Sequence, residues 1–206
     1  MRKLILTIAV LAIALTSLGA PALAAKKKTT TLYLHGKAPV QEAFINEMWL
    51  DSIWMTMDAT EPTKADPASM NVTNYVNGPN TDCDGNGLLP VWKGSYAAKF
   101  KGDAKVTLHT VATPATTMVV SLYADPTGTC TSNLPTGSST APKPVAQTEV
   151  EVAPGPAATE IVFKKLNFKA FGSLALQLHI PTQSPGQVRV LFDSANYPSN
   201  VQLLPK

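Results

Sequence analysis

The chain has 206 residues, of which 15% are charged, and its formal net charge is +3. This small charge argues against a nucleic-acid-binding protein, because such proteins neutralise phosphates with a strongly basic face. The length suits one domain with a sizeable core, and no internal repeat or long linker divides it. We therefore expect a single domain that does not bind nucleic acid.

The first 25 residues have the three-part pattern of a secretory signal peptide. Arg2 and Lys3 form a basic start, an apolar run continues to Leu18, and small residues end at Ala24 in an A-x-A-like cleavage site. The run is shorter than the roughly 20 apolar residues that span a bilayer. We expect cleavage near residue 25, which leaves residues 26–206 with a charge of +1 as a secreted or cell-envelope protein without a membrane span.

Turn residues separate many short segments with strand patterns. In 173–180, leucine and isoleucine occupy every second position, which is typical of a half-buried strand. Proline and glycine between the segments cannot continue a ladder and favour turns. The expected strands are 30–36, 91–100, 105–111, 117–124, 148–152, 160–168, 173–180, 187–193 and 201–204. This pattern predicts an all-β protein, an antiparallel β-sandwich of jelly-roll type over residues 26–206, with at most one short helix near 39–50.

Two stretches resemble a known class of module. Residues 94–130 and 186–199 are similar to strand–turn patterns in galactose-binding-like jelly-roll domains, including those at the C-terminus of X-Pro dipeptidyl-peptidase-like enzymes. The chain also looks like secreted bacterial or archaeal proteins. The resemblance implies a non-catalytic sandwich, because no peptidase domain accompanies it here.

The stretch TDCDGNGLLPVW, residues 81–92, contains the most concentrated chemistry of the chain. Asp82, Asp84 and Asn86 have the spacing with which a calcium loop begins, but Lys93 stands where a bidentate glutamate belongs. A tight turn without metal explains the same residues. If calcium binds, another loop must add oxygens, and Asp125 is one candidate.

The two cysteines, Cys83 and Cys130, are expected to pair, because an exported chain meets an oxidising environment. Closing this loop would constrain the unfolded chain by about 4 kcal/mol.

No motif indicates catalysis. The three histidines, His35, His109 and His179, lie on expected strands, with Asp193 and Ser194 on a later one, but no nucleophile elbow, zinc motif or phosphate loop accompanies them. His179 falls on the polar face of its strand and is expected to be solvated. We predict no catalytic residues and no required cofactor.

Aromatic residues suggest a binding surface. Trp92 and Tyr96 are four positions apart and would face the same side of one strand. Exposed rings on a sandwich can stack against sugars. We therefore expect a non-catalytic binding or cell-surface module for carbohydrate or cell-envelope polymer. The alternatives are a structural or adhesive protein with protein partners and a hydrolase whose site is assembled across loops.

Overall fold

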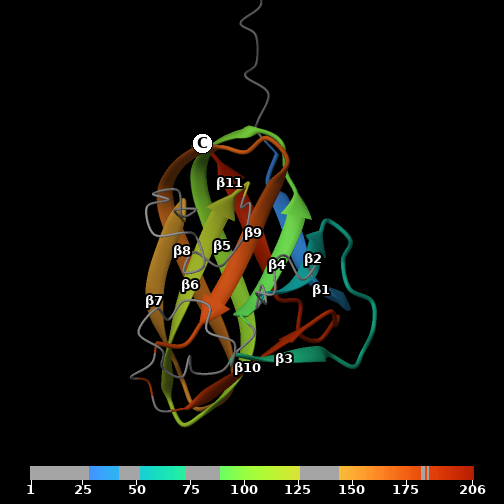
Figure 1. The fold of residues 1–206 in the computed structure, drawn as a ribbon, viewed down its shortest axis with the longest axis vertical. Helices are drawn as coiled ribbons and strands as arrows, with labels where there is room; N and C mark the ends of the chain where they lie inside the picture. The colour runs from blue at the N-terminus through green and yellow to red at the C-terminus, as the bar shows by residue number, and fades with distance from the viewer. Residues whose placement is uncertain (1–27, 42–51, 73–88, 126–143, 182–183, 185) are drawn as a thin grey trace, which may run out of the picture.

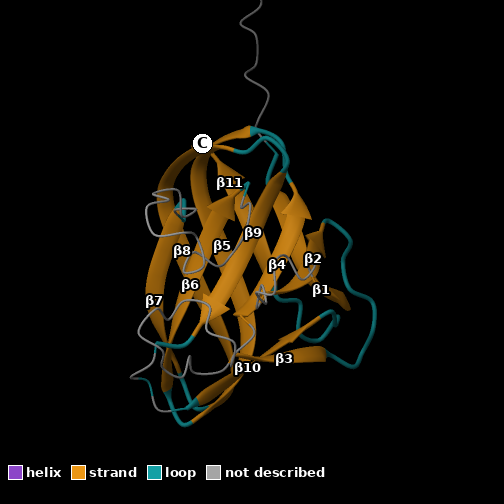
Figure 2. Ribbon diagram, in the orientation of Figure 1, coloured by secondary structure: helices purple, strands orange, loops and turns teal. Residues whose placement is uncertain are grey.

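The computed structural model describes residues 28–41, 52–72, 89–125, 144–181, 184 and 186–206. Figure 2 shows only strands and loops in this part of the chain. The eleven strands are β1 (Thr30–Gln41), β2 (Ser52–Asp58), β3 (Ala68–Val72), β4 (Leu89–Ser95), β5 (Lys99–Thr113), β6 (Thr116–Ala124), β7 (Ala146–Val152), β8 (Gly155–Lys169), β9 (Ser173–His179), β10 (Gln187–Phe192) and β11 (Asn200–Pro205). The predicted all-β class is confirmed.

The strands form one hydrogen-bonded sheet that folds over into a sandwich (Figure 1). Its order is β3-β10-β5-β11-β1-β2-β4-β9-β6-β7, and β8 pairs with β5. Long β5 organises one layer: β10 and β11 pair with successive parts of it, and β8 pairs along nearly its whole length. In the other layer β4, β9, β6 and β7 lie side by side. One pair, β2 with β4, is parallel. The sheet is therefore mixed, whereas the sequence predicted antiparallel pairing throughout.

The core lies between the two layers and follows from the period-two patterns. Along β5, buried and outward residues alternate from Phe100 to Ala112. The apolar face predicted for β9 is also confirmed, since Leu174, Leu176 and Leu178 are fully buried. The opposite face of β9 is covered too, because Gln177 is buried and accepts a hydrogen bond of 3.0 Å from the Tyr123 hydroxyl. Ala175 on this face is buried as well, and it packs with Val91 of β4 and Tyr123 of β6 in a second, small apolar cluster that alternation along β9 alone does not reveal.

The predicted segment 91–100 divides into two strands. β4 ends at Ser95, and β5 begins at Lys99 after a short connection. Gly94 allows β4 to approach β2 closely, because a Cβ atom there would lie 2.3 Å from the Met57 carbonyl oxygen. The expected helix 39–50 begins in strand β1, which continues to Gln41, and its remainder lies outside the described residues.

The predicted signal peptide, residues 1–25, also lies outside the described residues, as do both cysteines and the predicted calcium ligands Asp82, Asp84 and Asn86. Their pairing and metal binding stay predictions. The described residues include no helix with the length and apolar character needed to cross a membrane.

Candidate binding site

The two aromatic residues predicted to form one ligand surface occupy different environments. Trp92 is fully buried and packs edge-on against Phe192, with ring centroids 5.3 Å apart. A sugar-stacking ring must expose a face, so the stacking role predicted for Trp92 does not fit its position. Tyr96 lies beyond the end of β4, is half-buried, and lines a surface pocket. Only Tyr96 therefore remains a candidate of the predicted pair.

The pocket beside Tyr96 combines aromatic, aliphatic and basic side chains. Its volume is about 190 Å³, and it is lined by Lys28, Thr30, Tyr96, Lys99, Phe100, Lys101, Leu203 and Pro205. These residues come from the start of β1, the β4–β5 connection, the start of β5 and the end of β11, which meet at one end of the sandwich (Figure 1). A pocket of this composition can hold a ring-shaped group beside an anion.

The aromatic side of the pocket rests on a cluster of three tilted rings. Tyr96 lies 6.2 Å from Phe168, and Phe168 lies 5.2 Å from Phe100, between ring centroids. Burial raises the pKa of the Tyr96 hydroxyl, which therefore stays protonated at neutral pH and can donate a hydrogen bond. This cluster anchors Tyr96 to the core while Tyr96 still lines the pocket.

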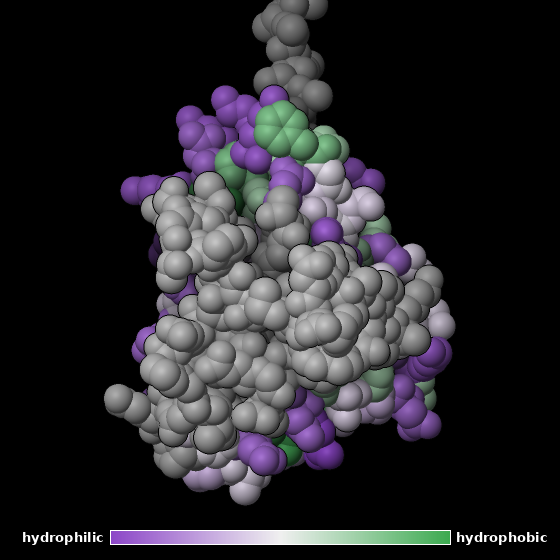
Figure 3. Space-filling view, in the orientation of Figure 1, coloured by the Kyte–Doolittle hydropathy of each residue, from purple (hydrophilic) through white to green (hydrophobic). Residues whose placement is uncertain are grey.

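An exposed phenylalanine stands at the same end. Phe171 lies in the turn between β8 and β9 and is 73% exposed, and the Lys169 ammonium lies 4.3 Å from its ring centroid. Figure 3 shows apolar surface among hydrophilic side chains at this end of the molecule. An exposed aromatic ring that a cation partly covers remains available to an apolar ligand face.

The turn that bears Phe171 is held by one carboxylate. The Asp125 side chain accepts backbone N–H hydrogen bonds from Phe171, Gly172 and Ser173. The bond from Phe171, followed by that from Ser173, holds the pKa of Asp125 below its ordinary value. Asp125 was the residue expected to supply an extra calcium oxygen, but the structure gives its carboxylate three backbone donors. Within the described ranges, no group of three or more His, Cys, Asp or Glu residues is arranged for a metal ion.

Backbone bonds join this turn to the loop that positions Tyr96. The Tyr96 N–H donates to the Gly172 carbonyl over 3.0 Å, and the Ala170 N–H donates to the Ala98 carbonyl over 3.0 Å. Tyr96 and the Phe171 turn are therefore parts of one rigid end. Phe171 was not predicted as a site residue, because in the sequence it is only an isolated aromatic residue beside a glycine.

The structure brings one predicted histidine to an aspartate. His35 Nδ1 lies 2.9 Å from Asp193 Oδ1, and His35 Nε2 lies 3.2 Å from Asp58 Oδ1. The Asp58 carboxylate is therefore near His35 Nε2 without well-directed hydrogen-bond geometry. Across the described part of the chain, neither ring nitrogen of His35 bonds a hydroxyl group.

The other two histidines lie elsewhere. His109 packs edge-on against Tyr197, 5.7 Å between ring centroids, beside a shallow apolar pocket of about 200 Å³, and burial lowers its pKa. His179, predicted to be solvated, is half-buried at the end of β9. The three histidines therefore form no common site.

Comparison with known proteins identifies the fold. No protein-family model and no curated protein sequence matches the chain. Among solved structures, the chain resembles a CocE/NonD family hydrolase from Staphylococcus aureus (TM-score 0.51, 11% identity, 85% of this chain and 36% of the hydrolase). It also resembles an α-amino acid ester hydrolase (0.54, 13%, 86% and 36%) and an aminopeptidase from a marine-sediment Thaumarchaeota archaeon (0.52, 9%, 86% and 36%).

These similarities define a class of fold and nothing finer. The chain spans about a third of the length of each of these three proteins, so it is similar to one β-sandwich part of a larger enzyme. The resemblance to hydrolase-associated sandwich modules is therefore confirmed for the fold. Two carbohydrate-binding modules match with TM-scores of 0.38 and 0.32, which is too remote to bear on function.

Proposed function

We propose that the protein is an exported, non-catalytic module that binds carbohydrate or cell-envelope polymer through the end that contains Tyr96 and Phe171. The observation that carries the proposal is the pocket beside Tyr96, where an anchored aromatic ring and several lysines line one hollow. An aromatic ring beside polar groups is a common way to bind a sugar.

Three further observations support a binding module that does not catalyse a reaction. Among the described residues that line the pocket there are lysines and a tyrosine but no carboxylate or histidine, so these residues do not form the paired carboxylates of glycoside hydrolysis. His35 has an aspartate at each ring nitrogen, and within the described part of the chain neither nitrogen bonds a hydroxyl group. Export is inferred from the pattern of residues 1–25.

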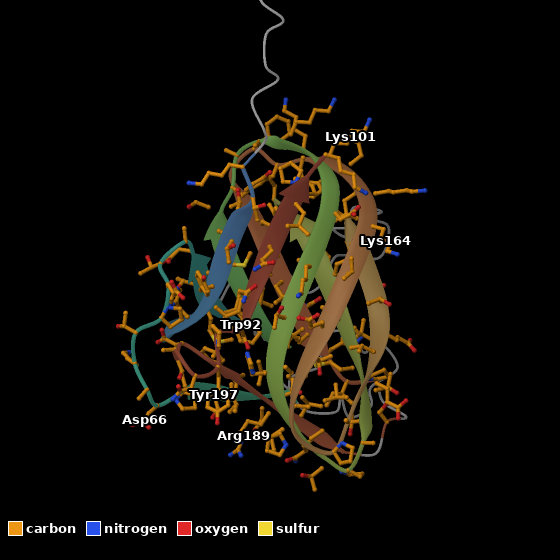
Figure 4. All side chains as sticks on the ribbon, turned by 180° about the vertical axis from the view of Figure 1, so that it is seen from behind. Asp66, Trp92, Lys101, Lys164, Arg189 and Tyr197 are labelled. Carbon is orange, nitrogen blue, oxygen red and sulfur yellow. The ribbon has the colours of Figure 1, made fainter. Side chains whose placement is uncertain are left out.

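Binding can be measured by retention on insoluble polysaccharides such as cellulose, chitin and purified cell wall. We expect the parent protein to be retained, and Tyr96→Ala and Phe171→Ala each to lower retention at least fivefold. The control is Tyr197→Ala, which removes a tyrosine at the opposite end of the molecule (Figure 4). All variants are first compared by thermal melting to establish that they are folded.

The result decides between the function classes. If no polysaccharide retains the parent protein, or if Tyr197→Ala lowers retention as much as Tyr96→Ala, the proposed function is wrong. Turnover of ester or glycoside substrates that survives repurification would instead favour the hydrolase alternative.

A further inference from the structure

The outer surface of β5 and β8, together with Lys28 just before β1, has an excess of lysine at the end that contains the pocket. We call this surface the basic face. All of its lysines are exposed, and in the described part of the chain none has a carboxylate within ion-pair distance. The basic face comprises Lys28, Lys99, Lys101, Lys164, Lys165 and Lys169.

The acids near the basic face are occupied. Asp103 pairs with the C-terminal residue Lys206 at 2.8 Å and accepts the backbone N–H of Lys165 at 2.8 Å. Further along β5, Lys105 pairs with Glu160. Each of these two acids therefore has an ion-pair partner outside the basic face, and although the charge of Lys164 also acts on Asp103, the six lysines of the basic face outnumber the acids beside them.

The pairing of β5 and β8 places like charges opposite each other. Lys99 lies directly across from Lys169, and Lys101 lies across from Asn167. Like charges at directly opposed positions destabilise a sheet. A bound anion between Lys99 and Lys169 would offset this repulsion, so the arrangement favours an anionic ligand.

An irregularity in β8 adds two more lysines. The register of β5 and β8 shifts between Gly102 and Ala104, opposite Lys164 and Lys165. Lys165 has a φ of 57°, which is unfavourable for a residue with a Cβ atom, and its N–H is held by the Asp103 carboxylate. Because of this bulge, two successive lysines are both exposed instead of alternating between core and solvent.

The lysines extend along the strand direction. From Lys165 to Lys169, β8 covers about 13 Å at roughly 3.3 Å per residue. Figure 4 shows Lys101 at the end of the sandwich and Lys164 further along the same side. A row of this kind suits a chain with repeated negative charges, whereas a flat lipid surface would meet only the outermost residues.

The aromatic residues do not suit single-stranded nucleic acid. Such ligands stack successive bases on several exposed rings. Here Phe100 is buried, Phe168 is half-buried between two other rings, and the Phe171 ring is partly covered by Lys169. One pocket beside Tyr96 fits one sugar unit better than a series of bases.

We propose that the ligand of the basic face is an anionic glycopolymer, one sugar of which sits beside Tyr96 while its carboxylate or phosphate groups contact the lysines. This inference rests on the proposed function and narrows its ligand class. Binding should then weaken with salt, because cations bound to the polyanion are released when lysines replace them.

The test uses two matched pairs of soluble polymers. Polygalacturonate is compared with its fully methyl-esterified form, and phosphomannan with the same polymer after removal of phosphate. We expect the full-length mature protein to bind at least one charged form more than tenfold tighter than its neutral partner, and tenfold weaker at 300 mM than at 20 mM sodium chloride. The two pairs distinguish carboxylate from phosphate as the recognised group.

Two double variants test whether the charged polymer binds at the basic face. Each of them removes two positive charges. Lys99→Gln with Lys101→Gln should weaken binding of the charged polymer at least tenfold. Lys64→Gln with Arg189→Gln, outside the basic face, should change it less than twofold. Melting curves of both variants establish that they are folded.

Several outcomes would overturn the inference. If neutral polymers bind as tightly as charged ones, without salt dependence, the ligand is not anionic, although the proposed polymer-binding function still holds. If phosphatidylglycerol vesicles or single-stranded DNA bind tighter than both charged glycopolymers, the partner is a membrane or a nucleic acid instead. If no polysaccharide of any kind binds, the proposed function itself fails.

Discussion

Two regions of this molecule use the same kinds of residue in opposite ways. The first, which we call the junction, consists of Trp92, Phe192, Asp193 and His35. The second is the basic face with its neighbouring rings. In the junction the Trp92 ring packs on Phe192, and the next residue, Asp193, bonds His35. On the basic face the rings line a pocket and the lysines project into solvent.

The two regions differ in whether their charged and aromatic side chains contact other parts of the protein or face solvent. Asp193 is mostly buried and contacts both His35 and Lys64, and its backbone N–H donates to the Leu34 carbonyl over 3.2 Å. These bonds fasten the connection between β10 and β11 to β1. The side chains of the basic-face lysines form no ion pair within the described part of the chain, so their charges contribute little to folding and can meet a ligand.

The largest expected effect on stability distinguishes the buried ring of Trp92 from the exposed ring of Phe171. Trp92→Ala should lower the free energy of unfolding by about 3–5 kcal/mol, because it removes a fully buried ring and leaves a cavity in the core. Urea unfolding followed by far-UV circular dichroism measures this. Phe171→Ala, at an exposed ring, should change stability by no more than about 0.5 kcal/mol. Equal losses in the two variants would remove the distinction between core and surface rings.

An intermediate effect is expected at the charged part of the junction. Asp193→Asn keeps the shape of the side chain and tolerates the φ of 55°, but it removes the negative partner of His35 and Lys64. We expect a loss of about 1.5–3 kcal/mol at pH 7, as for hydrogen bonds to charged groups. Lys64→Gln, at an exposed residue 3.5 Å from Asp193, should cost less than about 1 kcal/mol.

The pH dependence provides an independent check of Asp193. Burial by itself would raise the pKa of this carboxyl, but the hydrogen bond from His35 and the charge of Lys64 hold the pKa below its ordinary value. The stabilisation is therefore complete above the unfolded pKa of about 4 and is lost as pH falls through the lower folded pKa. The stability difference between the parent and Asp193→Asn should shrink below about pH 4. A constant difference down to pH 2 would contradict this assignment.

The smallest stability effect belongs to the basic face. Lys169→Gln removes the repulsion across from Lys99, so the free energy of unfolding should stay within about 0.5 kcal/mol of the parent or rise. The same variant should lose affinity for the charged polymer. A clear loss of stability would mean that Lys169 supports the fold, and the contrast between the two regions would fail.

Much of the fold was predictable because strands and turns leave local signals. The alternation in 105–111 and 173–180 marked β5 and β9, and proline or glycine marked most of the connections. The two-sided burial of β9 and the parallel pairing of β2 with β4 were not predictable, since each depends on segments distant in the chain.

The candidate site was predictable only in part. Tyr96 was chosen from its spacing to Trp92, but spacing shows only that two side chains share a face. That face can point to the core or to solvent, and here Trp92 is in the core while Tyr96 lies past the end of the strand. The basic face could not be predicted from the sequence, because its lysines come from three separate segments: Lys28 before β1, two lysines on β5 and three on β8.

By itself the sequence determined the all-β class, the position of most strands and the nearly balanced overall charge. Those properties follow from local periodicity, turn chemistry and composition, which a linear chain already contains. Only the tertiary structure decided that Trp92 is enclosed, that His35 meets Asp193, and that Lys99 faces Lys169. The physical reason is that strand register and the closure of one layer over the other bring distant residues together, and each strand pattern is compatible with many such pairings.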